Sequence, residues 1–248
     1  MISTSGVYRD VDGRSLDNAA RDGFPRLPEA IPETQPTVDP GPETYASRKV
    51  SIERRMLDGA QRPVTILRPG AIYGPHSRHP REWWFVKRIL DGRIRIPLAY
   101  GGNSRFHPAA VGELARLVHG AVRWPGTRIL NAADAKAPTA LEIGSAICSH
   151  LSFRGTLVPI DAGDDRGNAH VGWSPWSVAR PFVLSTSAAA ELGHAPTSVY
   201  GTQVGPVIDL LARQPPRCWK EAFPILASYP RDLFDYAAED AYFDGRKS

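Results

Sequence analysis

Residues 64–75 read Val64-Thr-Ile-Leu-Arg-Pro-Gly-Ala-Ile-Tyr-Gly-Pro75. The aliphatic and β-branched run at 64–68 is typical of a buried parallel strand, and the glycines and prolines after it predict a sharp turn. A second strand that ends in polar residues is predicted for Ile129-Leu-Asn-Ala-Ala-Asp134, and a third for Met1-Ile-Ser-Thr4. We therefore expect residues 1–4, 64–68 and 128–131 to be parallel strands of one sheet, with residues 1–4 at an exposed apolar edge.

A helix is predicted over residues 43–59, between the first two of these strands. Tyr45 and Lys49 lie four residues apart in it, so they share one helix face. A phenol titrates near ~10, and an adjacent ammonium group lowers that pKa because it stabilises the phenolate. The hydroxyl of Thr4, arriving from a neighbouring strand, could hold a substrate oxygen. Together these groups can move the proton of an alcohol while a hydride leaves its carbon.

The order of these motifs resembles the extended short-chain dehydrogenase/reductase family, in its NAD-dependent epimerase/dehydratase branch. Thr4 on a strand, Tyr45-x3-Lys49 on a helix, and a strand that runs into Arg68-Pro-Gly-x3-Gly-Pro75 follow one another, and the resemblance extends over roughly residues 1–200. It implies an α/β fold: the C-terminal part of a doubly wound Rossmann-type parallel sheet plus a small mixed substrate lobe. It also implies NAD or NADP as the cofactor.

The resemblance assigns roles to single residues. Tyr45 would be the general acid/base, Lys49 would lower its pKa and bind the nicotinamide ribose, and Thr4 would hydrogen-bond the reacting oxygen. Tyr45 and Lys49 would both contact the cofactor. The nicotinamide side would also meet Pro69, Gly70 and Ala71.

The residues after Thr4 separate the reactions of the family. Its sugar 4,6-dehydratases carry Asp and Glu there, whereas this chain has Ser5 and Gly6, neither of which ionises near neutral pH. Dehydration is therefore disfavoured. The expected activity is an NAD(P)-dependent epimerase or dehydrogenase that acts on a secondary alcohol of a sugar nucleotide or a similar metabolite.

The candidate substrate-binding residues are Ser5, His76, Arg105 and His107. Arg105 precedes Val111-Gly-Glu-Leu-Ala115, where the family often places an arginine that holds a nucleotide-sugar phosphate. The usual position falls on Phe106, one residue later, so a phosphate contact and a surface arginine both stay open. His76-x2-His79 could supply two metal ligands, but no third ligand is near in the sequence; polar contacts to substrate are favoured and no metal is predicted.

Dinucleotide binding on this fold requires a glycine-rich turn after the first strand, and none of the 22 glycines has the G-x-G-x-x-G or G-x-x-G-x-x-G spacing. In the family, four strand–helix units precede the strand that carries the catalytic hydroxyl. In this chain the corresponding strand begins at residue 1. We therefore expect the C-terminal part of a larger enzyme, through a misplaced start or a genuine truncation, and expect the isolated chain to be inactive. The alternative is a non-catalytic remnant or interaction module that lost its nucleotide-binding half.

Composition excludes several other classes. The hydrophobic content is 42%, the charged content 23% and the net charge +4, as in an ordinary globular protein. Arginines are spread along the chain rather than clustered, so nucleic-acid binding is not expected. No apolar run is long enough for a membrane span or a signal peptide, and Cys148 and Cys218 lie far apart, so free thiols in a reducing cytoplasm are expected. Twenty-five of the 30 basic residues are Arg, which suggests a GC-rich bacterial genome.

Three regions are expected along the chain. Residues 1–75 would form a partial Rossmann domain, which strand 128–134 joins, and residues 76–216 mainly a substrate-binding lobe. Residues 217–248 are an aromatic C-terminal extension that either packs onto the body or forms a partner surface, so a homodimer stays possible. The Pro-rich loop at 9–42 would be a lid over a small-molecule substrate or a solvated insert.

Overall fold

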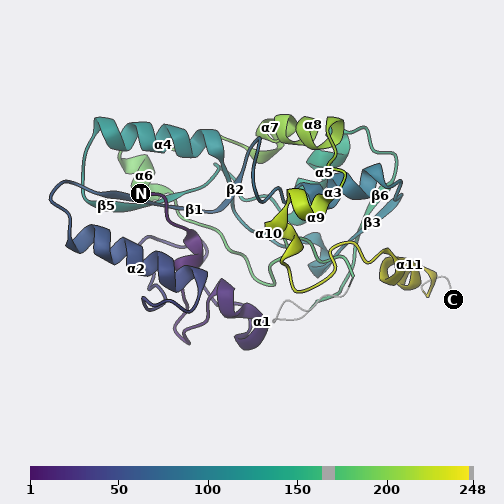
Figure 1. Ribbon diagram of the computed structural model, residues 1–248, viewed down its shortest axis with the longest axis horizontal. Helices are drawn as coiled ribbons and strands as arrows, with labels where there is room; N and C mark the ends of the chain where they lie inside the picture. The colour runs from purple at the N-terminus through teal and green to yellow at the C-terminus, as the bar shows by residue number, and fades with distance from the viewer. Residues whose placement is uncertain (164–170, 246–248) are drawn as a thin grey trace. The chain divides into compact units, whose positions relative to one another are not determined.

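The computed structural model describes residues 1–163 and 171–245 and divides the chain into two compact units (Figure 1). Unit 1 consists of Met1–Ile72, Phe106–Ala137 and Arg180–Val199. Unit 2 consists of Tyr73–Arg105, Pro138–Ala179 and Tyr200–Ser248. The chain returns twice to each unit, so neither unit is one continuous segment of sequence.

Unit 1 contains a small parallel sheet with helices on both faces. Its elements are η1 (Ser5–Val7), η2 (Leu16–Asn18), α1 (Ala19–Asp22), α2 (Tyr45–Asp58), β1 (Thr65–Pro69), β4 (Pro108–Ala110), α4 (Val111–Arg123), β5 (Arg128–Ala132) and α6 (Ser187–Glu191). The short strand β2 (Ala71–Tyr73) begins in unit 1 and pairs with β4.

The three predicted strands lie side by side and run parallel. β1 pairs with β5 in the register Thr65↔Arg128 to Pro69↔Ala132. The N-terminal residues join the other edge of β1 through a parallel bridge between Ile2 and Leu67, in which Ser3 N donates to Leu67 O at 2.7 Å. This pairing is shorter than the predicted strand 1–4, and Ile2 is 47% exposed at the edge.

Helices cover both faces of this sheet, with α2 on one side of β1 and β5 and α4 on the other (Figure 1). Leu114 and Leu117 of α4 pack with Ala189 of α6 against Leu67 and Leu130 of the strands. The opposite face meets a second buried cluster, to which Val50 of α2 contributes. The α/β fold with a parallel sheet that the sequence predicted is thus present.

The pattern of residues Pro108 to Val122, with a proline at the start, predicts one helix, and the structure differs at its beginning. Residues Pro108–Ala110 form β4, and α4 begins only at Val111. A proline suits the first turn of a helix, but it also suits a strand position whose N–H needs no partner. All three residues of β4 are buried, so sheet pairing and burial decide against the local helical preference.

The loop at 9–42 packs onto unit 1 as an ordered segment. Tyr8 and Thr37 form an antiparallel bridge, and Ile31 forms a parallel bridge with Leu184. The Asp10 carboxylate accepts backbone N–H bonds from Asp12, Arg14 and Arg26, which closes the loop on itself. The segment is therefore part of the packed body of unit 1 rather than a solvated insert.

Unit 2 is built from helices around a second pair of parallel strands. Its elements are α3 (Trp83–Leu90), β3 (Arg95–Leu98), η3 (Tyr100–Gly102), α5 (Ala140–His150), β6 (Thr156–Pro159), α7 (Tyr200–Gln203), α8 (Gly205–Arg213), α9 (Trp219–Ala222), α10 (Pro224–Ala227) and α11 (Tyr236–Asp244). β3 pairs with β6 from Arg95↔Thr156 to Leu98↔Pro159.

The aromatic C-terminal residues pack, mostly half-buried, against the rest of unit 2. Phe223 packs edge-on against Trp83, with ring centroids 5.5 Å apart. The guanidinium group of Arg88 on α3 forms a buried ion pair of 2.5 Å with Glu239 on α11. Residues 217–245 therefore pack against the rest of unit 2, which is one of the two alternatives that the sequence left open.

Within the described ranges, no helix is long and apolar enough to cross a membrane. Cys148 and Cys218 are both free, as the sequence predicted.

A partly buried histidine in unit 2 links its stability to pH. The Tyr229 hydroxyl lies 3.1 Å from His79 Nε2, and the two rings are tilted by 42° with centroids 5.7 Å apart. Burial, together with the positive charge of Arg81, lowers the pKa of His79 from 6.5 to about 3. The folded protein therefore holds His79 neutral, whereas the unfolded chain binds a proton there below pH 6.5.

The free energy of unfolding of unit 2 is expected to fall as pH drops from 6.5 toward 3. A depressed histidine pKa gives stability that is complete above the unfolded value, and the slope reaches about 1.4 kcal/mol per pH unit. The His79→Phe variant keeps an aromatic ring for Tyr229 and should lose less stability over this interval. Urea unfolding, monitored by tryptophan fluorescence, measures the free energy of unfolding of unit 2, because five of the six tryptophans lie in that unit. Equal pH slopes for both proteins would contradict the assignment.

Candidate active site

The first turn of α2 presents Tyr45 and Lys49. Thr44 caps the helix: its side chain accepts from Ser47 N at 3.1 Å, and Ser47 Oγ in turn accepts from Thr44 N at 2.9 Å. This reciprocal cap starts the helix at Tyr45, whose side chain is 52% exposed. The Lys49 ammonium lies 5.6 Å from the centroid of the Tyr45 ring, as expected for positions one turn apart.

Lys49 connects the helix to the N-terminal strand. Its Nζ atom donates to the carbonyl of Ile2 at 3.3 Å. Two residues further on, Thr4 Oγ1 accepts from Gly6 N at 3.1 Å and so caps η1. A hydroxyl has one proton to donate in addition to its acceptor sites, so the Thr4 O–H can still donate to a substrate oxygen.

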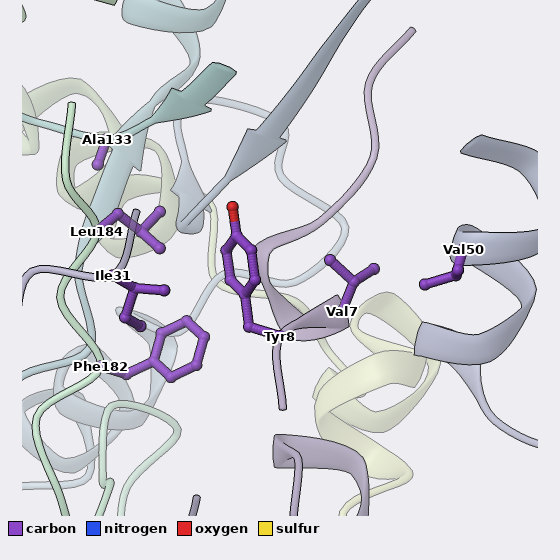
Figure 2. Close-up of a cluster of buried hydrophobic side chains, with 7 residues drawn as sticks. All are labelled: Val7, Tyr8, Ile31, Val50, Ala133, Phe182 and Leu184. Atoms are coloured by element: carbon purple, nitrogen blue, oxygen red, sulfur yellow. The ribbon is translucent and has the colours of Figure 1, made fainter. Parts of the chain in front are cut away.

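A buried apolar cluster fixes the segment that follows Thr4 against α2 (Figure 2). It consists of Val7, Tyr8, Ile31, Val50, Ala133, Phe182 and Leu184. Figure 2 shows Val7 of η1 facing Val50 of α2, with Tyr8 beside it among the side chains of the other elements. Because Val50 follows Lys49 directly and Val7 lies three residues after Thr4, this packing sets the spacing between the two parts of the site.

The pKa of Tyr45 differs from the sequence prediction. The sequence predicted that Lys49 lowers it, but in this structure partial burial and the negative charge of Asp17 raise the pKa of Tyr45 above 10.0. The Lys49 ammonium lies over the ring and bonds to Ile2 O. The phenol is therefore protonated at neutral pH and suited to donate a proton.

A buried polar network supports the site, and the sequence did not reveal it. Arg68 on β1 and Glu53 on α2 form an ion pair of 2.6 Å, with side-chain exposures of 5% and 3%. The Arg68 guanidinium also lies 5.0 Å from the ring of Tyr8, whose hydroxyl donates to Asn131 Oδ1 at 2.7 Å. Burial raises the pKa of Tyr8 to about 12, so this phenol stays neutral.

Glu53 is buried although glutamate is usually exposed on a helix of this kind. It is 2% exposed. Glu53 lies three residues after the buried Val50, and i, i+3 positions share a helix face. A carboxylate on the apolar side of α2, with an arginine inside the buried strand, is the signal that could have revealed the pair.

The turn at 69–71 has its backbone donors in use. Gly70 N donates to Ala132 O at 2.9 Å, and Ala71 N donates to His107 O at 2.8 Å. A Cβ on Gly70 would lie 2.2 Å from His107 O, so only glycine allows these two segments to approach so closely. A nicotinamide contact here would therefore use carbonyl oxygens or van der Waals surface rather than the amides of Gly70 and Ala71.

Two of the predicted substrate-binding residues are buried. His107 is 4% exposed; its Nδ1 accepts from Leu184 N at 3.2 Å, and its Nε2 lies 2.9 Å from Asp134 O. With both ring nitrogens bonded to backbone, His107 holds three segments of unit 1 together, which corrects its assignment to the substrate. Ser5 is 2% exposed and lies in η1 beneath α2.

The other two, His76 and Arg105, belong to unit 2. His76 is exposed, has a φ of 62°, and lines a cavity of about 350 Å³ together with Arg78 and apolar residues of α8. His79 Nε2 lies 3.1 Å from the Tyr229 hydroxyl. No group of three or more His, Cys, Asp or Glu that could hold a metal is found in residues 1–163 and 171–245.

No family model and no curated protein matches the sequence, but solved structures do. The dTDP-glucose 4,6-dehydratase of Bacillus anthracis in complex with NAD has a TM-score of 0.60 at 17% identity, over 89% of this chain and 63% of that one. The UDP-glucose 4-epimerase of Thermus thermophilus with NAD has a TM-score of 0.57 at 19% identity, over 84% and 62%. The UDP-N-acetylglucosamine 4-epimerase of Bacillus cereus has 0.57 at 18%, over 86% and 64%.

This chain therefore spans less than two thirds of the length of each of these proteins. They are nucleotide-sugar epimerases and a dehydratase, two of them with NAD bound. They match the parallel sheet and flanking helices described above, over most of this chain. The chain has the Rossmann-type α/β fold of NAD-dependent nucleotide-sugar epimerases and dehydratases, as the sequence predicted.

Proposed function

We propose that this chain carries the proton-transfer site of an NAD(P)-dependent epimerase or dehydrogenase that acts on a secondary alcohol of a sugar nucleotide or a similar metabolite. The observation that carries the proposal is the half-exposed Tyr45 with the Lys49 ammonium 5.6 Å from its ring and bonded to the strand that ends in Thr4. The shared fold supports it. The enzyme would be cytoplasmic, and a homodimer is compatible with the proposal.

Each group has one task in the proposed reaction. The Thr4 hydroxyl donates to the reacting oxygen and orients it. The Tyr45 phenol, protonated at neutral pH, gives its proton to a carbonyl oxygen during reduction and takes it back during oxidation. For the second step the Lys49 ammonium must act on the phenolate oxygen, where a positive charge stabilises the anion.

The residues present fit the nicotinamide end of a dinucleotide. The bound cofactor would supply the hydride acceptor or donor. Lys49 and Tyr45 offer an ammonium and a hydroxyl for the ribose, and the partly exposed Gly70 is proposed to meet the ring, since Pro69 and Ala71 are buried. No glycine-rich turn for the pyrophosphate occurs in the sequence, so the residues of this chain do not fit that part of the cofactor.

On the substrate side, Ser5 and Gly6 cannot supply the acid and base that removal of water requires. Epimerisation or simple oxidoreduction therefore remains the preferred chemistry. Arg105 is proposed for a phosphate and His76 for a polar substrate contact, both in unit 2.

The chain is expected to bind NADH and reduced nicotinamide mononucleotide with similar, weak affinity. Charge-assisted hydrogen bonds contribute roughly 1.5–3 kcal/mol each, and those that normally hold a pyrophosphate are not encoded here. Saturation-transfer NMR on the whole chain detects both ligands. Lys49→Met should weaken both signals, whereas Lys136→Met removes an exposed lysine elsewhere in unit 1 and should change neither.

Two outcomes would contradict this expectation. Micromolar NADH binding with much weaker mononucleotide binding would reveal a pyrophosphate site that the sequence did not show. No signal from either ligand would favour the second candidate, a non-catalytic interaction module without its nucleotide-binding half. The missing glycine-rich turn is the observation that favours that candidate.

A further inference from the structure

A carboxylate from the loop at 9–42 is docked on the first turn of the catalytic helix. Asp17 lies in η2, and its Oδ2 atom accepts from Ala46 N at 2.9 Å. Ala46 follows Tyr45 directly in α2. The Thr44 side chain already caps Ser47 N, so Asp17 supplies a second, separate acceptor for the first turn, from 29 residues away in sequence.

The position of this carboxylate matters because few charges act on Tyr45. From α2 itself the Lys49 ammonium lies over the ring, and from η2 the Asp17 carboxylate raises the energy of the phenolate. The nearest other cation of α2, Arg48, donates to Pro42 O. In the first loop, Arg14 pairs with Asp12, and Arg21 with Asp22. Among the described residues, the phenol thus lies between one positive and one negative charge from two different elements.

We propose that Asp17 is a positioning residue of the Tyr45 site: its carboxylate orients the first turn of α2 through Ala46 N and opposes Lys49 in setting the charge around the phenol. The proposal rests on the proposed function of Tyr45. On this proposal the loop at 9–42 also controls the charge near Tyr45. If η2 moved away, the negative charge of Asp17 would be lost, and the positive charge of Lys49 alone would act on the phenol. Loop position and the acidity of Tyr45 are thereby linked.

Asp17 and Lys49 are expected to shift the pKa of Tyr45 in opposite directions. Burial contributes most to the raised pKa of Tyr45, and Asp17 adds to it. Removing the Asp17 charge should therefore make the phenol easier to deprotonate, and removing the Lys49 charge should make it harder. Asp17 is exposed, so the effect should shrink as salt rises, because screening weakens exposed charge pairs.

The test is a pH titration of the whole chain by carbon-13 NMR with ring-labelled tyrosine, in which Tyr45→Phe assigns the Tyr45 resonance. Asp17→Asn keeps a side-chain acceptor for Ala46 N but removes the charge, and it should move the Tyr45 midpoint to lower pH. Asp17→Ala removes both and should also speed hydrogen exchange at the Ala46 amide. Asp12→Asn removes the same charge from the same loop, away from α2, and should leave both readouts unchanged.

A Tyr45 midpoint that is the same in Asp17→Asn as in the unmodified chain would overturn the proposal, as would an equal shift in Asp12→Asn. Unchanged Ala46 exchange in Asp17→Ala would overturn the orienting role. None of these measurements needs turnover or cofactor. A shifted midpoint in a chain that binds no nicotinamide ligand would therefore count against the proposed function alone and leave the role of Asp17 at Tyr45 standing.

Discussion

In a longer form of the enzyme that binds NAD(P) and turns over, the Tyr45→Phe variant is expected to lose ~10²–10⁴-fold in kcat/KM, the usual contribution of a general acid/base. The phenol is half exposed at the start of α2, and the other groups assigned to the site, Thr4 and Lys49, serve the reacting oxygen and the phenolate. Turnover is measured with a UDP-sugar and NAD⁺, as conversion to the epimer by chromatography for epimerisation and as NADH absorbance for net oxidation. Thr4→Ala should cost less, and Lys49→Ala should weaken both turnover and cofactor binding.

Tyr8→Phe is the matched control for the loss of a phenol in unit 1. Its hydroxyl donates to Asn131 inside the core, so its removal should lower the free energy of unfolding by roughly 1 kcal/mol and leave the pH dependence of turnover unchanged. A Tyr45→Phe protein that keeps nearly the full rate while Lys49→Ala abolishes it would show that the roles are assigned wrongly.

Glu53→Gln is expected to destabilise unit 1 by roughly 3–5 kcal/mol, because it leaves a buried guanidinium without its carboxylate. Arg68 stays charged: burial acts to lower its pKa, but the hydrogen bond with Glu53 and the neighbouring Tyr8 outweigh burial and raise it. The pair joins α2 to β1, so its loss also loosens the helix that carries Tyr45 and Lys49. Urea unfolding and hydrogen exchange of the α2 and β1 amides measure the effect.

The double variant Glu53→Leu with Arg68→Met should recover most of this stability, since well-packed apolar residues often replace a buried ion pair at little cost. Arg55→Gln, an exposed position on the same helix, should change the free energy of unfolding by no more than about 0.5 kcal/mol. If Glu53→Gln also changed the free energy of unfolding by no more than about 0.5 kcal/mol, the ion pair of Glu53 and Arg68 would not be an essential link between α2 and β1.

The elements that the sequence predicted well are those with strong local signals. The helix predicted at 43–59 is α2, Tyr45–Asp58, because a capping pair starts it and a glycine follows it. The strands at 64–68 and 128–131 correspond to β1 and β5, whose apolar runs have no comparable helical pattern. The parallel strands β3 and β6 were not predicted; they are short, both contain proline, and their partners lie about 60 residues apart.

The spacing of Tyr45 and Lys49 followed from the sequence, whereas the electrostatics around them did not. The spacing of Tyr45 and Lys49 is a local property of a helix, so it could be predicted from the chain alone. The pKa of Tyr45 depends on Asp17, which only folding of the loop brings to α2. His107 illustrates the same rule: its ring is held by the backbones of Asp134 and Leu184. Contacts between residues far apart in sequence set burial and charge, and these decide whether a polar residue serves the chemistry or the core.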